Sequence, residues 1–275
     1  MHEAGSPEAA VPATAEISAD EREAAVRVLG RRRVAVFIVA FNAERHLESV
    51  VARIPPEIRS RLAEIFIIDD SSTDATWHVA ERVCAQYPDL PMRAYRTPFN
   101  RGYGGNQKLG YLYSSRQKYD WVVLLHGDGQ YAPEFLPRLI AAMDDDADAV
   151  FGSRMMRKRW ALAGGMPLYK WVGNQILTGI ENWFLRTHLS EFHTGFRAYR
   201  ISSLERVPFV FNSDDFHFDT EIIIQAVASR WKIREVAIPT HYGDEKCHVN
   251  GLRYAWNCIK ALTRFRLVHL GLFYE

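Results

Sequence analysis

Cysteines are few in this sequence, and the three present, Cys84, Cys247 and Cys258, lie far apart along the chain. An odd number of scattered cysteines argues against a disulfide framework and against a CxxC zinc site. The sequence also has no run of about 18 apolar residues, so we expect no membrane-spanning helix. Because the N-terminus lacks the apolar core of a secretory signal, a cytoplasmic location is the default expectation.

An excess of charge of either sign is also absent. Among the 275 residues, Lys and Arg number 34 and Asp and Glu number 33, so the formal net charge is +1. A protein that binds many nucleic-acid phosphates usually carries a basic excess, so we expect no nucleic-acid partner. Most of the basic residues are Arg, which reflects either codon bias or the use of Arg for binding anions. No feature of the sequence indicates an oligomeric state.

Strands and helices are expected to alternate from residue 34 onwards. Continuous apolar runs predict strands that are covered on both faces, and the segments between them predict helices. Strands are expected at 34–40, 64–68, 92–96, 121–125 and 149–152, and helices at 43–54, 74–87, 105–118 and 133–143. This alternation predicts an α/β fold with a mostly parallel sheet and helices on both faces.

The two ends of the chain differ from this alternating part. Residues 1–17 show no periodicity and predict a disordered tail, whereas residues 18–33 predict a helix and a basic linker. Ser18 and Glu21 have the spacing of a capping box for that helix. Residues 246–275 predict a C-terminal amphipathic basic helix.

Three helices and one strand are expected after residue 155. The helices are predicted at 167–185, 218–229 and 251–270, and the strand at 232–238. The helix at 167–185 is amphipathic, with an apolar stripe of Val172, Ile176, Ile180 and Trp183. The Trp and Phe residues of these late helices are expected to pack in the core rather than to form a binding surface.

Polar residues follow several of the predicted strands. In parallel sheets ligands bind at the carboxyl ends of the strands, which directs attention to the loops after Ala40, Ile68, Leu125 and Gly152. Asp69 and Asp70 end the second strand, where carboxylates can accept hydrogen bonds from a base or a ribose hydroxyl. The alternative for this segment is a helix cap and a solvated turn.

A Gly-Asp-Gly segment follows the strand at 121–125. Asp128 at this strand end, flanked by His126 and Gln130, can hold Mg²⁺ or Mn²⁺, which complete their coordination with water and substrate phosphates. The alternative is a simple turn. The glycine-rich run at 100–110 can cradle phosphate before a helix, although it matches neither a P-loop nor a dinucleotide fingerprint. The acidic run at 144–148 precedes a strand, away from the ligand edge, and predicts a solvated turn.

Several motifs, taken together and in order, point to one family. They are Phe37-Ile38-Val39-Ala40-Phe41-Asn42-Ala43-Glu44, Ile68-Asp69-Asp70-Ser71-Ser72-Thr73-Asp74, Asn100-Arg101-Gly102-Tyr103-Gly104, Asp128-Gly129-Gln130, Gly152-Ser153-Arg154 and Thr194-Gly195-Phe196-Arg197. The sequence resembles the family 2 glycosyltransferases with a GT-A fold. Within that family it is most similar to the dolichyl- or polyprenyl-phosphate sugar synthases. The resemblance covers about residues 34–245, which predicts the extent of the GT-A domain.

The resemblance implies a role for each matching residue. Phe41, Asn42, Glu44, Asp69, Asp70, Asn100, Gly102 and Asp128 would bind the nucleotide sugar. Asp128 and Gln130 would hold the metal, with His126 as a further candidate ligand. Arg154 would bind the acceptor phosphate, with Arg197 and Arg200 as further candidates.

The sequence departs from the family pattern at two positions. His126 stands where the family usually has an acidic residue, so it is a metal ligand, a contact to the sugar or the ligand shell, or a packing residue. Glu191 stands where relatives often carry Asp. An inverting transfer to a hydroxyl needs a general base, and Glu191 is the first candidate. Further candidates are Asp214, Asp215, Asp219 and Glu221.

Two basic segments suggest a membrane surface. Residues 154–159 place four cations around two methionines, and the helix at 251–270 has a basic face with Arg253, Lys260 and Arg264. Such segments can lie in the lipid headgroup layer, as a peripheral attachment. The alternative is a solvated loop and an ordinary amphipathic helix packed on the sheet.

The resemblance therefore implies an inverting, metal-dependent enzyme with Mg²⁺ or Mn²⁺ as cofactor. It would move a hexose from a UDP- or GDP-sugar to a polyprenyl phosphate at the cytoplasmic face of a membrane. One alternative keeps the fold but uses a hydroxyl of a saccharide, a protein or a small molecule as acceptor. Another is a non-catalytic protein that binds nucleotide sugars.

Overall fold

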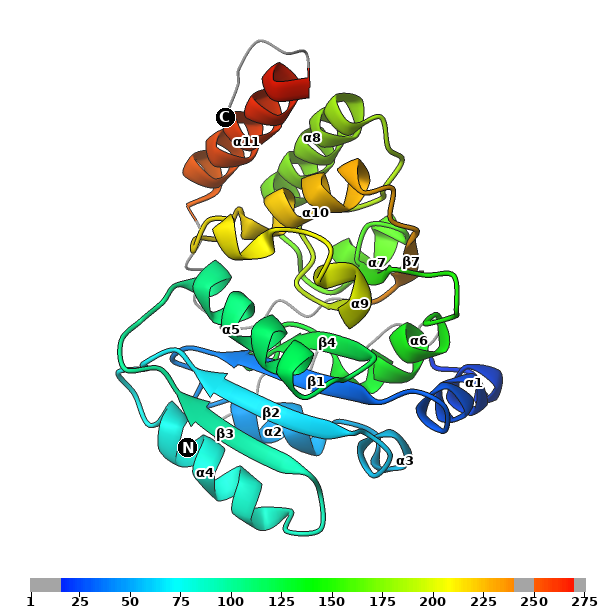
Figure 1. Ribbon diagram of the computed structural model, residues 1–275, viewed down its shortest axis with the longest axis vertical. Coiled ribbons are helices and arrows are strands. Elements are labelled where there is room, and N and C mark those ends of the chain that lie inside the picture. Colours follow the sequence, from blue (N-terminus) through cyan, green and yellow to red (C-terminus); the bar gives the residue numbers. More distant parts are fainter. Residues whose placement is uncertain (1–15, 240–249, 270–275) are drawn as a thin grey trace, which may run out of the picture.

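A mixed β-sheet forms the centre of the computed structural model, which describes residues 16–239 and 250–269 (Figure 1). In these residues the sheet has seven strands in the order β3-β2-β1-β4-β6-β5-β7. The strands are β1 (Val34–Ala40), β2 (Glu64–Asp69), β3 (Met92–Arg96), β4 (Trp121–His126), β5 (Ala149–Ser153), β6 (Arg197–Arg200) and β7 (Ile233–Ala237). All neighbouring pairs are parallel except those of β6, which runs antiparallel to β4 and β5. The predicted α/β class is confirmed, but β6 was not predicted.

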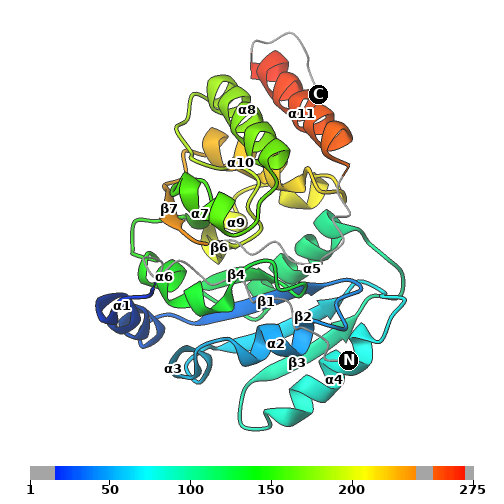
Figure 2. The same ribbon diagram turned by 180° about the vertical axis from the view of Figure 1, so that it is seen from behind.

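Helices cover both faces of the sheet, as Figures 1 and 2 show. One face carries α1 (Ala19–Leu29), α2 (Leu47–Ala52), α3 (Pro56–Arg59), α4 (Thr76–Gln86) and α6 (Leu136–Ala141), which follows the short 3₁₀ turn η2 (Pro133–Phe135). The other carries α5 (Tyr103–Arg116), α9 (Ile201–Leu204), η3 (Phe209–Phe211) and α10 (Phe218–Ala228). Beyond α10 lie α8 (Leu168–Leu185) and α11 (Gly251–His269), with α7 (Lys158–Ala163) near the start of α8.

The central strand β1 supplies both cores because its residues alternate between the two faces of the sheet. Val36 and Ile38 pack under α2 and α6, whereas Phe37 packs on the opposite face. The ring of Phe37 stacks on Phe66 of β2 with centroids 5.0 Å apart. A continuous apolar run is therefore buried on both sides, which explains why the sequence pattern predicted this strand so well.

The predicted helix at 43–54 begins later than expected. The carbonyl of Ala43 accepts hydrogen bonds from the N–H groups of both His46 and Leu47, so residues before Leu47 form a turn. The Ala43 N–H is itself used by the hydroxyl of Thr76 at 2.7 Å. This long-range bond holds the start of the segment to the α4 region and outweighs the local periodicity. By contrast, the capping box of Ser18 and Glu21 is present as predicted.

The core packing expected for the Trp and Phe residues of the late helices is present for Phe218, Phe184 and Phe265, but it is wrong for Trp183 and Trp256. The apolar stripe of α8 is largely exposed. Val172, Ile176 and Trp183 are 40%, 60% and 71% exposed, and Trp256 of α11 is 67% exposed. The buried side of α8 instead carries Leu177, Thr178, Glu181 and Leu185. Among the described residues, no helix combines the length and the apolar character needed to cross a membrane. Of the tail predicted at residues 1–17, residues 1–15 lie outside the described residues.

Gly110 offers a test of the core packing. A methyl group at this buried position in α5 would overlap the ring of Phe37. We expect Gly110→Ala to lower the free energy of unfolding by about 1–3 kcal/mol in urea denaturation, although alanine favours helix formation. Gly179→Ala is the matched control, since a methyl group there meets nothing within 4 Å. We expect this control to be neutral or stabilising by up to about 1 kcal/mol. Equal effects of the two substitutions would contradict this account of the core.

Candidate functional site

The predicted site residues meet mainly at one edge of the sheet. Strands β1, β2, β4 and β5 run in the same direction. Their last residues, Ala40, Asp69, His126 and Ser153, therefore all lie at this edge. Because β6 runs the other way, it begins at this edge with Arg197, so the turn before it joins the loops that follow the parallel strands. The loops to which the topological rule directed attention therefore lie at the same edge of the sheet.

The loops after β1 and β2 hold each other through Asn42 and Glu44. Asn42 has a left-handed backbone (φ 50°), and its Oδ1 accepts the N–H of Thr73 at 2.9 Å. Glu44 Oε2 accepts the N–H of Ala75 at 2.9 Å, at the start of α4. Both predicted nucleotide contacts thus shape the loops, while Phe41 beside them is 39% exposed.

Two carboxylates end β2 in different surroundings. Asp69 is fully buried, accepts the N–H and hydroxyl of Ser72, and lies 3.3 Å from Arg96 Nε. Asp70 Oδ1 accepts the N–H of Arg101 at 2.8 Å and the hydroxyl of Thr97 at 3.1 Å. Burial raises the pKa of Asp70 despite these hydrogen bonds. Asp69 is therefore mainly a scaffold for its own loop, whereas Asp70 connects the β2 end to the glycine-rich segment.

The glycine-rich segment requires glycine at Gly102. This residue has φ 79°, and a Cβ atom there would come within 2.5 Å of the Asp214 carbonyl oxygen. That carbonyl accepts the N–H of Gly104 at 2.8 Å, which ties the start of α5 to the loop before α10. Asn100 Oδ1 accepts the Gly102 N–H at 2.8 Å. The predicted pocket-lining loop is thus a fixed turn beside the β2 carboxylates.

His126 is held from two sides at the end of β4. Its Nε2 lies 3.0 Å from the hydroxyl of Tyr103, and the same hydroxyl donates to Asp219 Oδ2 at 3.2 Å. Since Tyr103 has a single proton to donate, its oxygen accepts the Nε2–H of His126, and the lone pair lies on Nδ1. Burial lowers the pKa of His126, although the charges of Asp128 and Asp219 oppose this. A Cβ atom on Gly195 would overlap His126 Nε2, so the histidine also packs tightly.

Asp128 is the side chain best placed to hold a metal. It is half-buried in the turn after β4, and its Oδ1 accepts the N–H of Gln130 at 3.0 Å. No group of three or more His, Cys, Asp or Glu side chains in the described part of the chain could hold an ion by itself. One carboxylate fits Mg²⁺ or Mn²⁺ where substrate phosphates and water supply the other ligands. His126 could join only through Nδ1, because Nε2 is engaged by Tyr103.

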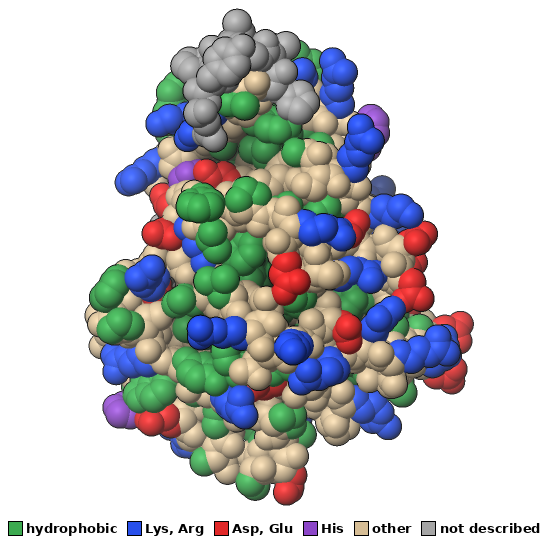
Figure 3. All heavy atoms as spheres, in the orientation of Figure 1, with side chains coloured by type: hydrophobic (Ala, Val, Ile, Leu, Met, Phe, Trp, Pro, Cys, Tyr) green, Lys and Arg blue, Asp and Glu red, His purple; other side chains and the backbone are tan. Residues whose placement is uncertain are grey.

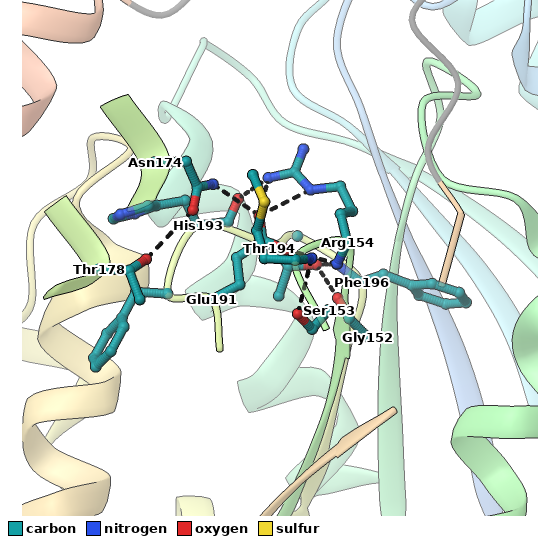
Figure 4. Close-up of polar contacts among 12 residues, drawn as sticks. Gly152, Ser153, Arg154, Asn174, Thr178, Glu191, His193, Thr194 and Phe196 are labelled. Atoms are coloured by element: carbon teal, nitrogen blue, oxygen red, sulfur yellow. Dashed lines mark hydrogen bonds and ion pairs between the residues drawn. The ribbon is translucent and has the colours of Figure 1, made fainter. Parts of the chain in front are cut away.

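Arg154 and Glu191 form a buried ion pair, shown in Figure 4. Arg154 donates its backbone N–H to Glu191 Oε2 at 2.7 Å and its Nε–H to Oε1 at 2.9 Å. Its Nη2 also donates to Glu191, and to the His193 carbonyl at 2.8 Å. Asn174 of α8 donates to the same Glu191 oxygen at 2.9 Å. The guanidinium is thereby fixed, with its carbon 5.6 Å from the ring centre of Tyr131.

This arrangement differs from the predicted role of Glu191 as a general base. Burial opposes ionisation of Glu191, but the charge of Arg154 and hydrogen bonds from Arg154 and Asn174 bring its pKa below the usual value. A general base works best with a pKa near the working pH. In this structure Glu191 is bonded to Arg154 and fixes its orientation, and its role as a base stays a prediction.

Arg197 and Arg200 do not join Arg154, which corrects their predicted role as acceptor-phosphate ligands. Arg197 is fully buried and donates to the carbonyls of Thr194 at 2.6 Å and Phe192 at 2.6 Å. Arg200 pairs with Trp121 at the start of β4, so it lies at the opposite edge of the sheet. Its guanidinium donates to backbone carbonyls of the acidic run at 144–148.

Tyr103 and Tyr131 are site residues that the sequence reasoning missed. Tyr103 connects His126 with Asp219, and Tyr131 accepts the Gly195 N–H on its hydroxyl at 2.6 Å. Tyr131 also packs edge-on against His126 with ring centres 5.0 Å apart. Their positions within the glycine-rich run and directly after Asp128-Gly129-Gln130 were the available indications.

A sequence comparison matches one protein family. The family model described as Glycosyl transferase family 2 matches residues 35–207. The chain is 28% identical over 236 residues to a polyprenol monophosphomannose synthase from Mycolicibacterium smegmatis, covering 83% of this chain and 84% of that protein. It is 27% identical over 214 residues to an undecaprenyl-phosphate mannosyltransferase from Micrococcus luteus, covering 75% and 82% respectively.

Solved structures share the fold. A glucosyl-3-phosphoglycerate synthase from Mycobacterium tuberculosis, in complex with Mn²⁺, uridine diphosphate and phosphoglyceric acid, superposes with a TM-score of 0.66. That match covers 89% of this chain and 82% of the other at 17% identity. A complex of the same enzyme with Mg²⁺ and uridine diphosphate gives a TM-score of 0.67. At this identity the likeness establishes the GT-A fold.

The buried pair predicts a pH-dependent stability. Because the pKa of Glu191 is lowered from 4.5 in the folded protein, its contribution is complete above pH 4.5 and is lost as the pH falls further. We expect Glu191→Gln to lower the free energy of unfolding at pH 7 by about 3 kcal/mol and to weaken its decline in acid. Urea denaturation across pH measures both effects. The control is Glu48→Gln, which removes an exposed partner of Arg82. Equal effects of the two variants would contradict the assigned importance of the buried pair.

Proposed function

The chain belongs to glycosyl transferase family 2, and on this basis we propose that it moves a hexose from a nucleoside diphosphate sugar to a polyprenyl phosphate. The chain is a glycosyltransferase by family, and relatives that match most of its length are named as polyprenyl-phosphate mannose synthases. The identity of the donor and the acceptor for this chain is our proposal. The observation that carries it is the fixed Arg154 at the same sheet edge as Asp70 and Asp128.

The donor would lie across the ends of β1, β2 and β4. Asp70 and the segment around Gly102 are joined through the Arg101 N–H, which gives a rigid wall for a nucleoside. Phe41, partly exposed at the end of β1, offers an aromatic surface beside it. Solved structures of the same fold with bound uridine diphosphate support this placement.

The leaving diphosphate would face Asp128. A divalent metal held by Asp128, with Gln130 and His126 Nδ1 as further candidates, would neutralise the charge that develops on the diphosphate. Asp128 needs no additional carboxylate for this, because substrate oxygens complete the coordination of Mg²⁺ or Mn²⁺. The hydrogen bond between Tyr103 and His126 would help to hold that side chain beside the diphosphate.

A phosphate acceptor fits the protonation chemistry of the site. A hydroxyl must lose a proton when it attacks, whereas a phosphate monoester is already an anion. The predicted candidate bases have partners within the protein. Glu191 pairs with Arg154, Asp219 accepts from Tyr103 and Gln107, and Asp214 pairs with Lys108. Asp215 and Glu221 accept the backbone N–H groups of Phe216 and Ser213. The planar guanidinium of Arg154 suits a phosphate oxygen, and Glu191 holds it in one orientation.

The attack would proceed in line with inversion at the anomeric carbon. Arg154 would position the acceptor phosphate on the side of the sugar opposite the diphosphate, so that the new carbon–oxygen bond forms as the bond to the diphosphate breaks. Because the enzyme would hold the two reacting groups in this geometry, the reaction would not have to bring them together and orient them in solution. The chain's own residues thus supply position and charge rather than a proton acceptor.

An acceptor panel tests this proposal. We expect nucleoside diphosphate release from at least one UDP- or GDP-hexose to require a short polyprenyl phosphate. The matched polyprenol, which lacks the phosphate, is expected to support no transfer, because each candidate base named above already has a partner within the described part of the chain. Chromatography of the nucleotide and mass spectrometry of the lipid measure both reactions. Transfer to the polyprenol or to a saccharide, without transfer to the phosphate, would overturn the proposed acceptor.

Asp128 provides a second test. We expect Asp128→Asn to lower kcat by about a hundredfold or more, because the variant loses charge at the diphosphate while keeping the shape of the side chain. Thermal unfolding should show that the fold is retained. The control is Asp146→Asn, which removes an exposed carboxylate paired with Lys232 before β5. Unchanged turnover in Asp128→Asn would remove this residue from the reaction.

A further inference from the structure

An apolar surface runs along α8, and no element of the described residues covers it. We define the α8 outer face as Tyr169, Val172, Ile176, Ile180 and Trp183, which recur every three or four residues and therefore share one side of the helix. Tyr169 is 73% exposed, Ile176 60% and Trp183 71%. A Cβ atom on Gly173 or Gly179, between these residues, would meet nothing within 4 Å. The face is thus open to solvent over most of the helix.

The inner side of α8 consists of apolar residues and of polar residues that are bonded to other parts of the protein. The outer face is therefore a second apolar side, not the polar side of an ordinary amphipathic helix. Leu177 and Leu185 are buried there, and the one acidic residue of the helix, Glu181, is fully buried. Glu181 is bonded to Thr220 and lies 3.1 Å from His193 Nε2. A continuous exposed apolar surface on a helix of this kind indicates a contact with another apolar phase or molecule.

The described segments that include α7, α8 and α11 carry exposed charge of one sign. Within residues 154–189 and 250–269 the only acidic residue is the buried Glu181. The same ranges hold exposed basic side chains in α11, in α7 and just before it, and just after α8: Arg157, Lys158, Arg159, Arg186, Arg253, Lys260 and Arg264. In Figure 3 blue and green side chains predominate where the α8 and α11 end is not covered by grey atoms, and most of the red ones lie lower. The net charge of +1 therefore conceals a strongly basic end.

These charges decide between the occupants of the surface. A second copy of the chain would bring two sets of basic side chains together, which opposes self-association through this face. A protein partner with defined contacts would need hydrogen-bonding groups, but Val172, Ile176 and Ile180 offer none. Trp183 and Tyr169 combine an apolar body with a polar atom, as suits the boundary between acyl chains and headgroups.

We propose that the α8 outer face, flanked by the basic side chains of α7 and α11, docks onto an anionic lipid bilayer. The α8 outer face enters the boundary of the acyl chains, and the basic residues contact lipid phosphates. Helix α11 lies beside α8 and is fastened to it, since Arg266 donates to the Phe184 carbonyl at 2.8 Å (Figure 2). Helix α11 also carries an exposed tryptophan, Trp256.

The inner side of α8 links this surface to the candidate site. Asn174 of α8 donates to Glu191, and Glu191 holds Arg154, so the docking helix contacts the ion pair directly (Figure 4). Docking through α8 therefore brings Arg154 towards the bilayer surface. This placement would let a polyprenyl phosphate reach Arg154 from the membrane. That use of the surface rests on the proposed function, whereas the docking itself does not.

Vesicle co-sedimentation tests the docking without any substrate. We expect the full chain to bind vesicles of phosphatidylcholine mixed with phosphatidylglycerol, and to bind phosphatidylcholine alone at least about tenfold more weakly. The double substitution Val172→Ser and Ile176→Ser should weaken binding to the anionic vesicles at least about tenfold, because both side chains lose apolar contact. The control is Leu112→Ser, an exposed apolar position on α5, which should bind like the unmodified protein.

Tryptophan fluorescence provides an independent readout. We expect anionic vesicles to shift the emission to the blue, and Trp183→Phe to reduce that shift, since Trp183 lies on the α8 outer face. Absence of binding to anionic vesicles, equal binding by the double variant, or equal binding to both lipid compositions would overturn the proposal. So would a dimer in solution that the double substitution dissociates, since the face would then be a contact between two copies.

Transfer assays separate this proposal from the proposed function. With a water-soluble short-chain polyprenyl phosphate, the double variant should keep the unmodified kcat/KM, because α8's outer residues touch no reacting group. With a long-chain acceptor embedded in anionic vesicles, the kcat/KM of the double variant should fall at least about tenfold. If the unmodified protein binds vesicles but transfers sugar to neither phosphate, the proposed function fails while the docking surface stands. If it transfers to both but binds no vesicles, the docking proposal fails alone.

Discussion

The reversal of β6 between β4 and β5 is the constraint on which the site depends. Because β6 is antiparallel to both neighbours, the segment before it reaches the same sheet edge as the ends of the parallel strands. Gly195 thereby packs on His126, and Glu191 meets Arg154 across 37 residues of sequence. Arg197 fixes this turn from within, since its buried guanidinium donates to carbonyls of the segment it follows. An apolar residue at Arg197 could fill the space but could not satisfy those carbonyls.

The sequence was informative where structure is local and misleading where it is not. Strands β1 and β4 were predicted because continuous apolar runs have few other uses, and the edge with Asp70, Asp128 and Arg154 followed from the topology of parallel sheets. Strand β6 was missed because it has four residues and begins and ends with Arg. Its burial depends on carbonyls from distant segments, which no local pattern reveals. The ion pair of Arg154 with Glu191 was missed for the same reason.

The exposed stripe of α8 shows a second limit of sequence reasoning. Periodicity identifies an apolar face of a helix, but it does not show whether protein, lipid or solvent lies against that face. Val172 and Ile176 fit the pattern of core residues, and only the packing of Leu177 and Leu185 on the opposite side shows that the core is already filled. Glu181 made the sequence pattern more misleading. As an acidic residue it marks its side of the helix as the polar, solvent-facing side, whereas the structure buries it.

His126 illustrates how a departure from a family pattern can be absorbed. With an acidic residue at this position, a second carboxylate would lie beside Asp128 and Asp219, and mutual repulsion would favour a bound cation. The imidazole removes that repulsion, and its Nε2–H instead satisfies the hydroxyl of Tyr103. In the proposed site, metal affinity would then rest mainly on Asp128 and on the diphosphate of the substrate. The cation and the nucleotide sugar would accordingly bind as one unit, so that an otherwise weak single-carboxylate site suffices while substrate is present.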